Sequence, residues 1–287
     1  AVEKYEDDGE LKFEPKAYGD KARALSGRAA ANTQIINPVD KGVIVNEALA
    51  TELLSYFLEK IEIGRRTAKR TEAVFILPCG VKESVKERYR AVAEACGLGS
   101  VYFTFMPFAA ILGHNKAISE SEPMFILDIG YSLTNIAVIS QDGIISGYSV
   151  SLGGGDIDVK IIDELADSHN LKIGALTAEK LKNTVGSLLE DDNKMNVVEG
   201  RGLRNGAPAS VAVDSAGIYD CISSVADKIL EYVNLLLTKL PAEVSSGVMQ
   251  GGIYLSGGLI KLDGLPEYIE EQTGIPVNVS EEPQLAA

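Results

Sequence analysis

Three glycine-rich turns, each following an apolar stretch, are the segments of this sequence best suited to chemistry. They lie at 128–130, 153–156 and 256–258 and read Asp-Ile-Gly, Gly-Gly-Gly-Asp and Ser-Gly-Gly. Glycine lets the backbone approach a ligand closely and adopts positive φ, so N–H groups can converge on a phosphate oxygen. An aspartate at a strand end, such as Asp128, can orient a hydrated Mg²⁺. Taken alone, each turn is more simply a plain tight turn, and Asp128 a hydrogen-bonded strand-end residue.

Alternating strand and helix patterns surround these turns. The sequence Asp142-Gly143 lies between two alternating apolar stretches and is a strong hairpin signal. This mixture predicts an α/β fold, and its hairpin-rich centre favours mixed over purely parallel sheets. The patterns predict strands at 72–80 and 100–106, three strands within 124–155, a small β region at 190–214, and helices at 48–62, 85–98, 158–170, 177–189 and 216–240.

Composition narrows the function classes. The chain has 287 residues, of which 46% are hydrophobic and 24% charged, as in a soluble globular protein with one large or two moderate domains. Its net charge of −14 argues against nucleic acid as a partner, because Lys and Arg drive phosphate binding. No apolar run is long enough to span a membrane. The cysteines Cys79, Cys96 and Cys221 share no metal spacing, which argues against a zinc site.

The order of the motifs resembles that of the actin-like ATPases, the superfamily that contains actin, hexokinase and the heat-shock chaperone ATPase domain. Within it, the chain is similar to MreB and its paralogues such as Mbl, from about residue 18 to the last residue. The resemblance implies an α/β, actin-like (ribonuclease H-like) two-lobed ATPase fold with mixed sheets. It rests on 37–58 (NPVDKGVIVNEALATELLSYFL), 127–140 (LDIGYSLTNIAVIS), 177–187 (TAEKLKNTVGS) and 237–265 (LTKLPAEVSSGVMQGGIYLSGGLIKLDGL).

This resemblance implies that ATP or ADP with Mg²⁺ binds in a cleft between the lobes. Glu179 and Lys182 match the positions that contact the adenosine in the family, and their spacing puts both on one helix face. Without the resemblance, an exposed i, i+3 ion pair is the simpler interpretation of these two residues. The remaining expected binding residues are Gly257 and Gly258 on the purine and α-phosphate side, Gly130 and Thr134 beside the phosphates, Gly154, and Asp128 near Mg²⁺.

Departures from the family pattern predict weak nucleotide binding and impaired hydrolysis. The family's second phosphate loop reads Asp-Ile-Gly-Gly-Gly-Thr-Thr, whereas 128–134 reads Asp-Ile-Gly-Tyr-Ser-Leu-Thr, so Tyr131 and Leu133 add bulk where backbone must approach closely. Met106 replaces the glutamate that positions the attacking water in the family, and a methionine cannot orient water or accept a proton. The third glycine of the adenosine loop is Leu259. We therefore assign no catalytic residue.

We expect two lobes, at 1–122 and 123–287. The family's first phosphate hairpin, Asp-x-Gly-Thr, has no counterpart in this sequence. At the other end, 280–287 (SEEPQLAA) stops before the family's final glycine-rich turn. Trimmed ends and a natural absence are both open interpretations. Within the lobes we expect a small subdomain at 1–36 and a core at 37–122, then a core at 123–158 and 216–287 with a small inserted subdomain at 159–215.

Three classes of function follow. The first is an MreB-like cell-shape-determining cytoskeletal protein that associates with itself into filaments or dimers and acts with cell-wall synthesis or division proteins. The second is a non-polymerising actin-fold regulator or a chaperone-like accessory protein. The third, a phosphotransferase of the sugar-kinase branch, is disfavoured because no catalytic aspartate in a substrate pocket can be identified.

The segment 64–70 (GRRTAKR) concentrates positive charge on an otherwise acidic chain. A basic segment can contact anionic lipid, with each charge contributing about 1 kcal/mol. A solvated loop is the simpler interpretation, since the segment lacks the apolar pair with which some MreB proteins enter the membrane. We expect a cytoplasmic protein, with the inner face of the membrane as a site of peripheral contact.

Overall fold

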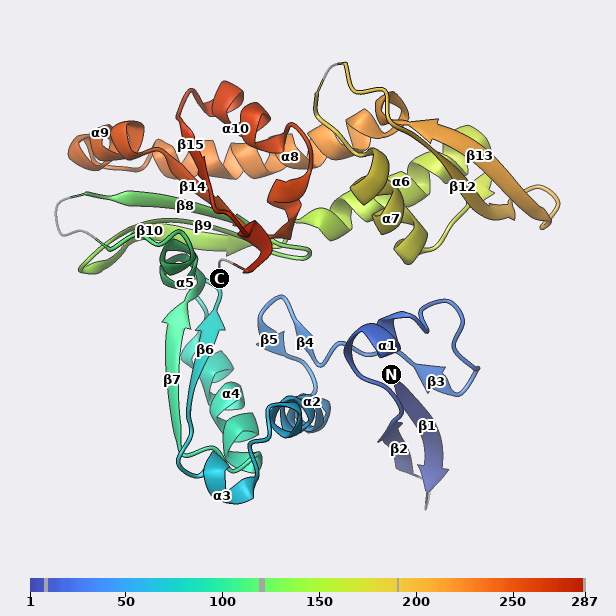
Figure 1. The fold of residues 1–287 in the computed structure, drawn as a ribbon, viewed down its shortest axis with the longest axis horizontal. Helices are drawn as coiled ribbons and strands as arrows, with labels where there is room; N and C mark the ends of the chain where they lie inside the picture. The colour runs from blue at the N-terminus through green and yellow to red at the C-terminus, as the bar shows by residue number, and fades with distance from the viewer. Residues whose placement is uncertain (8–9, 119–121, 190, 286–287) are drawn as a thin grey trace. The chain divides into compact units, whose positions relative to one another are not determined.

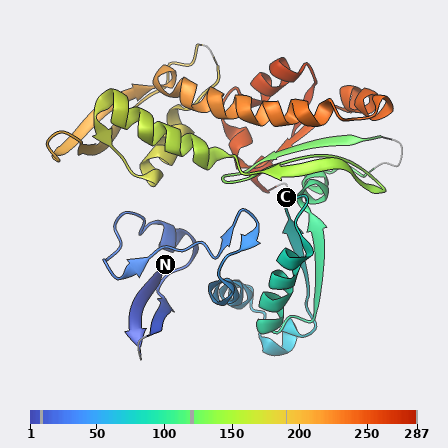
Figure 2. The same cartoon turned by 180° about the vertical axis from the view of Figure 1, so that it is seen from behind.

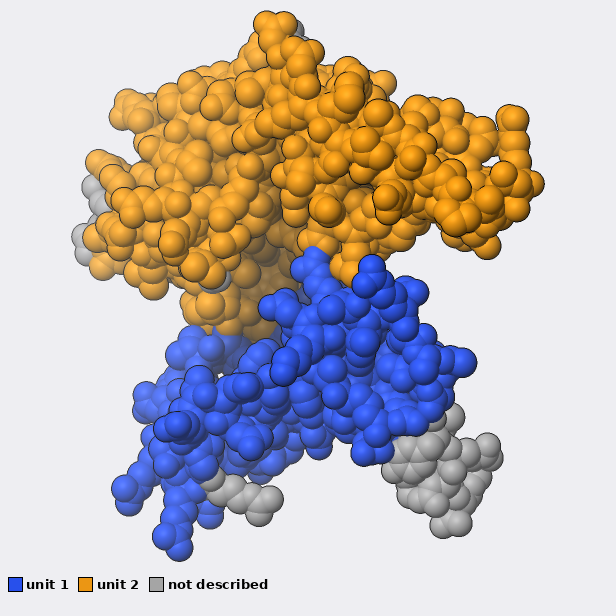
Figure 3. Space-filling model, turned by 45° about the vertical axis from the view of Figure 1, so that its right-hand side comes forward, with its two compact units in different colours: residues 1–75, 82–102 blue, residues 76–81, 103–287 orange. Residues whose placement is uncertain are grey.

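The fold is that of a computed structural model, which describes residues 1–7, 10–118, 122–189 and 191–285 (Figure 1). Strands and helices alternate along the chain, as the sequence patterns predict. The chain forms two compact units, which Figure 3 colours separately.

The second unit comprises residues 76–81 and 103–287, and the first comprises 1–75 and 82–102. The second unit includes the helix α5 (Met106–Gly113), because Ala110 and Ile111 are buried in one apolar cluster with residues of strand β8 (Met124–Ile129). The expected lobes at 1–122 and 123–287 stay a prediction, since these compact units divide the chain at other residues.

A five-stranded mixed sheet forms the centre of the second unit, in the order β10-β9-β8-β14-β15. The strands β8, β9 and β10 pair antiparallel, whereas β14 runs parallel to both β8 and β15. The Asp142-Gly143 turn joins β9 to β10, with Ser140 opposite Gly143, as the hairpin signal predicts. The bounds are β9 Thr134–Ser140, β10 Gly143–Val150, β14 Ile253–Ser256 and β15 Val277–Val279.

Alternate residues of β8 pack on opposite faces of this sheet. Phe125, Leu127 and Ile129 belong to the large apolar cluster that also contains residues of α6 and α8, whereas Met124 and Ile126 pack with α5. A strand that is buried on both faces reads as a continuous apolar run, which is why β8 shows no alternation. The long helix α8 lies along one side of the sheet (Figures 1 and 2). The helices are α6 Gly154–His169, α7 Ala175–Val185, α8 Ser215–Leu237, α9 Ala242–Gly251 and α10 Leu265–Thr273.

A smaller antiparallel sheet follows α6 in the chain. It contains β11 (Leu171–Lys172), β12 (Met195–Gly202) and β13 (Pro208–Asp214). The strands β12 and β13 lie in the small β region predicted at 190–214, whereas β11 precedes it. Val198 and Val213 bury their side chains in the large apolar cluster, so this sheet shares the core of the second unit.

The first unit has short strands and a smaller core. Ile44, Ala50 and Val92 form its buried cluster, to which α2 and α4 contribute. Its strands pair as β2-β1-β3 and β4-β5, and a further pair, β6-β7, has residues in both units. Bounds are β1 Val2–Asp7, β2 Glu10–Pro15, α1 Gly19–Arg23, β3 Thr33–Gln34, β4 Val39–Asp40, β5 Val43–Ile44, α2 Glu47–Lys60, α3 Arg65–Ala68, β6 Glu72–Leu77, α4 Glu83–Ala95 and β7 Ser100–Phe105.

Candidate functional site

A cavity of about 440 Å³ in the second unit is the candidate site. Its walls come from the turn after β8, the start of α6, the helix α7 and the short helix η1 (Gly258–Lys261). The volume lies within the usual range of small-molecule sites, roughly 300–1,000 Å³. Among the predicted binding residues, those that line it are Gly130, Gly154, Glu179, Lys182 and Gly258, whereas Asp128, Thr134 and Gly257 are not lining residues.

The helix α7 presents Glu179 to the cavity. Leu181 and Val185 bury the opposite face of the helix in the large apolar cluster. Glu179 and Asn183 are one turn apart on the remaining face, and both line the cavity. The amphipathic pattern of α7 therefore fixes which of its polar side chains can reach a ligand.

Lys182 is buried, so an exposed ion pair with Glu179 is the wrong interpretation of their spacing. Its side chain is 5% exposed, and its Nζ lies 2.7 Å from Oδ1 of Asp158 in α6. The same Nζ donates a hydrogen bond to the carbonyl of Gly154 at 2.8 Å and lies 5.6 Å from the centroid of the Tyr131 ring. The ammonium that the resemblance assigns to the adenosine is thus already neutralised within the protein.

The turn after β8 is closed by its own hydrogen bonds. The Gly130 N–H donates to the carbonyl of Leu133 at 2.9 Å. The N–H groups of Gly154 and Gly155 donate to the carbonyls of Gly130 and Tyr131, at 3.0 Å and 2.7 Å. The first N–H groups of a helix are common donors to phosphates. At the start of α6, these donors are already used by the neighbouring turn.

The same contact explains why glycines occur in a row at the start of α6. A Cβ atom at Gly153 would lie 2.6 Å from the carbonyl oxygen of Gly130, and one at Gly155 would lie 3.0 Å from the Tyr131 ring. The Gly153 N–H donates to Oδ2 of Asp156 at 2.9 Å. Close packing of the turn against α6 is therefore sufficient reason for this glycine motif.

Asp128 is a hydrogen-bonded residue at the end of β8. Its Oδ1 accepts a hydrogen bond from Ser256 and its Oδ2 accepts one from Asn135, both at 3.0 Å. Burial raises the pKa of Asp128, and these two hydrogen bonds oppose the shift. Across the described part of the chain, no group of three or more His, Cys, Asp or Glu residues could hold a metal ion. A metal at Asp128 would have to displace one of its present partners.

Thr134 and Gly257 shape the backbone behind the cavity. The Thr134 hydroxyl is buried and donates to the carbonyl of Leu152 at 2.8 Å. Gly257 has φ of 90°, and a Cβ atom there would lie 2.3 Å from the carbonyl oxygen of Ile129. Its N–H donates to the carbonyl of Pro283 at 2.7 Å. Both residues therefore hold neighbouring segments in place rather than contact the cavity.

Some lining residues were not predicted from the sequence. Asn183 could have been found, because it lies one helical turn after Glu179. The others follow a helix end or lie near η1 and η2 (Pro283–Leu285), where no period marks the ligand-facing side. The lining residues that sequence reasoning missed are Asn183, Gly186, Lys261, Leu262, Asp263 and Gln284.

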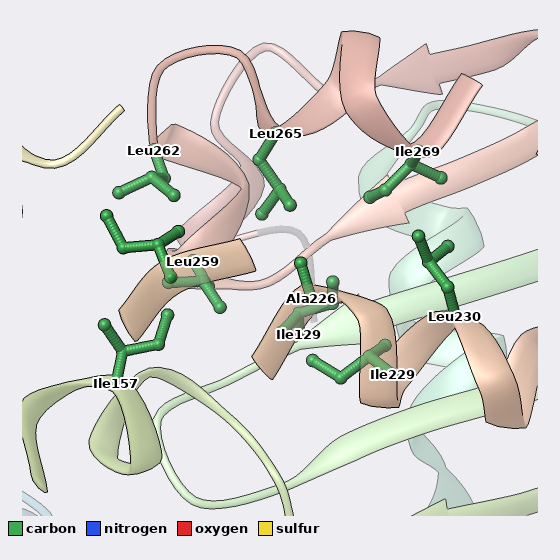
Figure 4. Close-up of a pocket in the computed structure, with 10 residues that line it drawn as sticks. Ile129, Ile157, Ala226, Ile229, Leu230, Leu259, Leu262, Leu265 and Ile269 are labelled. Atoms are coloured by element: carbon green, nitrogen blue, oxygen red, sulfur yellow. The ribbon is translucent and has the colours of Figure 1, made fainter. Parts of the chain in front are cut away.

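A second cavity lies in the core beside the first (Figure 4). Its volume is about 10 Å³, and its lining is apolar, with Ile157, Ala226, Leu259 and Ile269 among the side chains. A void of this size and polarity stays dry, so we treat it as a packing defect and not as a ligand site.

Comparison with known proteins identifies the family. A family model described as MreB/Mbl protein matches residues 7–287. The chain belongs to the MreB/Mbl family. Among its curated relatives, the cell shape-determining protein MreB of Escherichia coli (strain K12) is 30% identical over 268 residues, which cover 93% of this chain and 77% of that protein. The cell shape-determining protein Mbl of Bacillus subtilis is 27% identical, covering 93% and 80%.

Solved structures agree with this MreB/Mbl assignment at the level of the fold. The structure of MreB 5 of Spiroplasma citri bound to AMPPNP matches with a TM-score of 0.91 at 24% identity, covering 99% of this chain and 85% of that one. A MamK double helical filament matches with a TM-score of 0.77 at 19% identity, covering 94% and 82%. The predicted actin-like fold and the predicted class, an MreB-like cytoskeletal protein, are confirmed. Within the described residues of this MreB/Mbl protein, no helix combines the length and apolarity needed to cross a membrane.

Proposed function

We propose that this MreB-like protein binds ATP or ADP through its nucleoside and grips the phosphates weakly. The observation that carries this proposal is the cavity in which Gly130, Gly154, Glu179 and Gly258 come together from separate segments. MreB 5 of Spiroplasma citri, whose fold is similar, has been solved with AMPPNP and with ADP. The family relationship and the cavity together favour a nucleotide as the ligand.

The nucleoside end of the cavity offers groups that suit a ribose and a purine. Glu179 supplies a carboxylate that can accept hydrogen bonds from ribose hydroxyls. Asn183 and Gln284 supply amide groups, and Leu259 supplies an apolar surface. Gly258 lines the cavity, and a Cβ atom there would meet nothing within 4 Å, so its backbone leaves room for a ligand.

The phosphate end is less well equipped. The N–H groups of Gly130, Gly154 and Gly155 are used within the protein. A phosphate that took them would have to break existing hydrogen bonds, so each new bond would contribute little. If Mg²⁺ accompanies the nucleotide, Asp128 is the ligand we propose, after release of Ser256 or Asn135. A bound Mg²⁺ would supply charge to offset that of the phosphates.

Hydrolysis is impaired in this proposal. Met106 occupies the first position of α5, where the family resemblance calls for the glutamate that positions water. A thioether is only a weak acceptor and cannot take a proton from water. The protein would therefore bind nucleotide without turning it over at a useful rate.

Measuring nucleotide affinity in matched variants tests the binding proposal. Hydrogen bonds to charged groups contribute about 1.5–3 kcal/mol, so Glu179→Ala should weaken ADP binding by about tenfold or more in calorimetry. Glu199→Ala is the control, because Glu199 is an exposed carboxylate on β12 and is not a lining residue. Equal affinity of the two variants would remove the cavity as the nucleoside site.

We further propose that the chain associates with itself into filaments or dimers. A MamK filament shares its fold, and a head-to-tail contact that does not close into a ring generates a filament. Proteins of cell-wall synthesis or division are the partners we propose for such an assembly. Sedimentation of purified protein separates this function from the alternative of a non-polymerising regulator, since only an assembling protein pellets above a critical concentration.

Peripheral contact with anionic membrane from the cytoplasmic side is the location we propose. Two observations favour it: the basic segment 64–70 begins a few residues after α2, and apolar side chains are exposed at the end of that helix, with Phe57 in its last turn 50% exposed and Ile61, the residue after the helix, 65% exposed. Apolar side chains beside positive charge suit a lipid surface. Binding to vesicles that contain anionic lipid, but not to neutral vesicles, is the expected result. Loss of that difference in Arg66→Ser/Lys69→Ser/Arg70→Ser would assign it to this segment.

A further inference from the structure

Two walls of the cavity are joined at one end. The first wall is α7, which contributes Glu179 and Asn183, and the second is η1 with the loop after it, which contributes Lys261 and Asp263. The segment after α7 meets the loop after η1 at a parallel bridge between Ser187 and Asp263. A change at this junction would alter the spacing of the two walls.

The backbones at the junction are in tight contact. The Leu188 N–H donates to the carbonyl of Asp263 at 2.8 Å. Gly264 has φ of 78°, and a Cβ atom there would lie 2.9 Å from the Leu189 nitrogen. Within the segment after α7, the Ser187 hydroxyl accepts the Leu189 N–H at 3.1 Å. Only glycine fits where these two segments pass.

Lys194 adds a charged contact across the same junction. Its Nζ donates to Oδ2 of Asp192 at 2.7 Å and also forms an ion pair with Oδ2 of Asp263. The Lys194 carbonyl accepts a hydrogen bond from the Ser215 N–H at 3.0 Å, at the start of α8. The ammonium therefore connects the loop that lines the cavity to the segment that follows α7, and its own backbone is anchored to α8.

We propose that Asp192, Lys194 and Asp263 form a latch, which holds the two walls together and sets how long a nucleotide stays in the cavity. The inference rests on the proposed function. Its physical basis is that the backbones at this junction are joined by an isolated bridge and not by a continuous sheet ladder, so a charged contact beside the bridge adds to the resistance against separation. The side chains of Lys194 and Asp263 are 40% and 54% exposed, so dissolved salt screens the contact. Lys194, Asp192 and Asp263 are thus positioning residues.

Release of etheno-ATP from the full chain, chased with excess ATP, tests the latch. Lys194→Met should release the probe about fivefold faster, the ratio expected for an exposed ion pair at the upper end of its usual range. Lys194→Arg, which keeps the charge, should restore the parent rate. Lys228→Met is the matched control, because Lys228 is an exposed lysine on α8 of the same unit and is not a lining residue.

Salt separates a latch from a purely structural role. The parent should release the probe faster in about 1 M than in about 0.1 M salt, since the Debye length falls from about 10 Å to about 3 Å. Lys194→Met should lose much of this dependence while its thermal midpoint stays near that of the parent. A release rate and a salt dependence equal to those of the parent would overturn the proposal.

A double variant separates the latch from a simple charge effect. Asp263 lines the cavity, so Lys194→Met also deprives its carboxylate of the neighbouring cation. The carboxylate would then repel the negatively charged phosphates of a bound nucleotide. Adding Asp263→Asn removes that negative charge but does not restore the lost contact between residues 194 and 263. Fast release by Lys194→Met/Asp263→Asn supports the latch, whereas recovery of the parent rate overturns it in favour of charge alone.

Hydrogen exchange distinguishes failure of the latch from failure of nucleotide binding. If the parent does not bind etheno-ATP, the proposed nucleotide binding fails. Amide exchange at the junction then tests the latch without any nucleotide. Lys194→Met should then speed amide exchange at Leu188, whose N–H bonds across the junction, and at Leu189, whose N–H bonds within it, and leave exchange in α8 unchanged. Unchanged exchange at these two residues would overturn the latch as well.

Discussion

Lys182 shows how one side chain connects the site to the core. Its ammonium lies 2.7 Å from the Asp158 carboxylate, and both side chains are almost fully buried. Desolvation makes such a pair costly to form, yet removing one partner costs more, because the other charge stays in the protein interior. The pair therefore holds α7 against α6 and fixes the wall that carries Glu179.

Removing the ammonium alone should destabilise the second unit strongly. We expect Lys182→Met to lower the free energy of unfolding by about 3–5 kcal/mol, the usual cost of breaking a buried ion pair. The double variant Lys182→Met/Asp158→Leu should recover much of this loss, since no buried charge is left behind. Urea denaturation measures both. A double variant less stable than Lys182→Met would show that the pair stabilises the fold by its own attraction.

Thiol chemistry tests burial in both units. Burial raises the pKa of Cys79 to about 12 and that of Cys221 to about 11, so both thiols stay protonated at neutral pH. The thiolate is the reactive form. Ellman's reagent at pH 8 should therefore modify Cys96, which is only partly buried, well before the other two. Cys96→Ser should abolish the fast phase.

The pH dependence follows from the same shifts. Because the pKa values of Cys79 and Cys221 are raised, only a small fraction of each thiol is ionised near neutral pH, and that fraction rises about tenfold per pH unit. The slow phase of modification, which belongs to these two thiols, should accelerate in the same proportion until the pH approaches the pKa values. This holds while the chain stays folded. A slow phase that does not change with pH would mean that local opening, not ionisation, limits the reaction.

Among the elements, the turn from β14 into η1 depends on the backbone of one residue. Gly257 has positive φ and would direct a Cβ atom to 2.3 Å from the Ile129 carbonyl oxygen. Gly206, in the hairpin between β12 and β13, also has positive φ, but a Cβ atom there meets nothing within 4 Å. The two positions separate the cost of the dihedral from that of the steric clash.

We expect Gly206→Ala to cost about 1–2 kcal/mol, the penalty for an L-residue in a left-handed conformation. Gly257→Ala should cost about 1–3 kcal/mol more, because the clash with β8 adds an overpacking term. Urea midpoints of the two variants give the comparison. Equal destabilisation would show that β8 and η1 can move apart freely.

Phosphate affinity is also decided at the level of elements, where α6 meets the turn after β8. Since the first N–H groups of α6 already donate to that turn, ATP should bind within about tenfold of adenosine, which corresponds to no more than one charge-assisted hydrogen bond. Calorimetry with adenosine, ADP and ATP tests this. A nanomolar Kd for ATP alongside weak adenosine binding would contradict it.

Elements were predictable from sequence wherever a local pattern decides them. The helix expected at 216–240 is α8, Ser215–Leu237, whose start is fixed by the Asp214 side chain accepting the Gly217 N–H at 2.9 Å. The Lys182–Asp158 pair was not predictable, because the two residues lie on separate helices and only their packing brings them together. The hydrogen bonds from the first N–H groups of α6 to the turn after β8 were not predictable either, because they depend on how closely two segments distant in the sequence approach each other.

For the whole molecule, the family relationship indicates a cytoskeletal protein, whereas the local chemistry of the phosphate turn disfavours tight phosphate binding. Its MreB/Mbl relatives and the matched folds make this a member of a cytoskeletal family. Its net charge of −14 opposes the approach of a polyanion, and its phosphate turn uses its own donors. A protein can keep an assembly surface while losing turnover, because assembly depends on the fold and turnover depends on a few side chains.

We therefore expect no ATPase activity above background, with or without conditions that favour assembly. Loss of a water-orienting group costs roughly 10²–10⁴-fold in rate. Met106→Glu alone should restore little, since Tyr131 keeps its carbonyl bonded to Gly155 and its ring against α6. Adding Tyr131→Gly, Ser132→Gly and Leu133→Thr should do better, but only in a chain that carries a first phosphate hairpin, because the turn can then open towards a γ-phosphate that the hairpin holds. Steady phosphate release by the parent chain, abolished by Asp128→Ala, would show that the site is active as it stands.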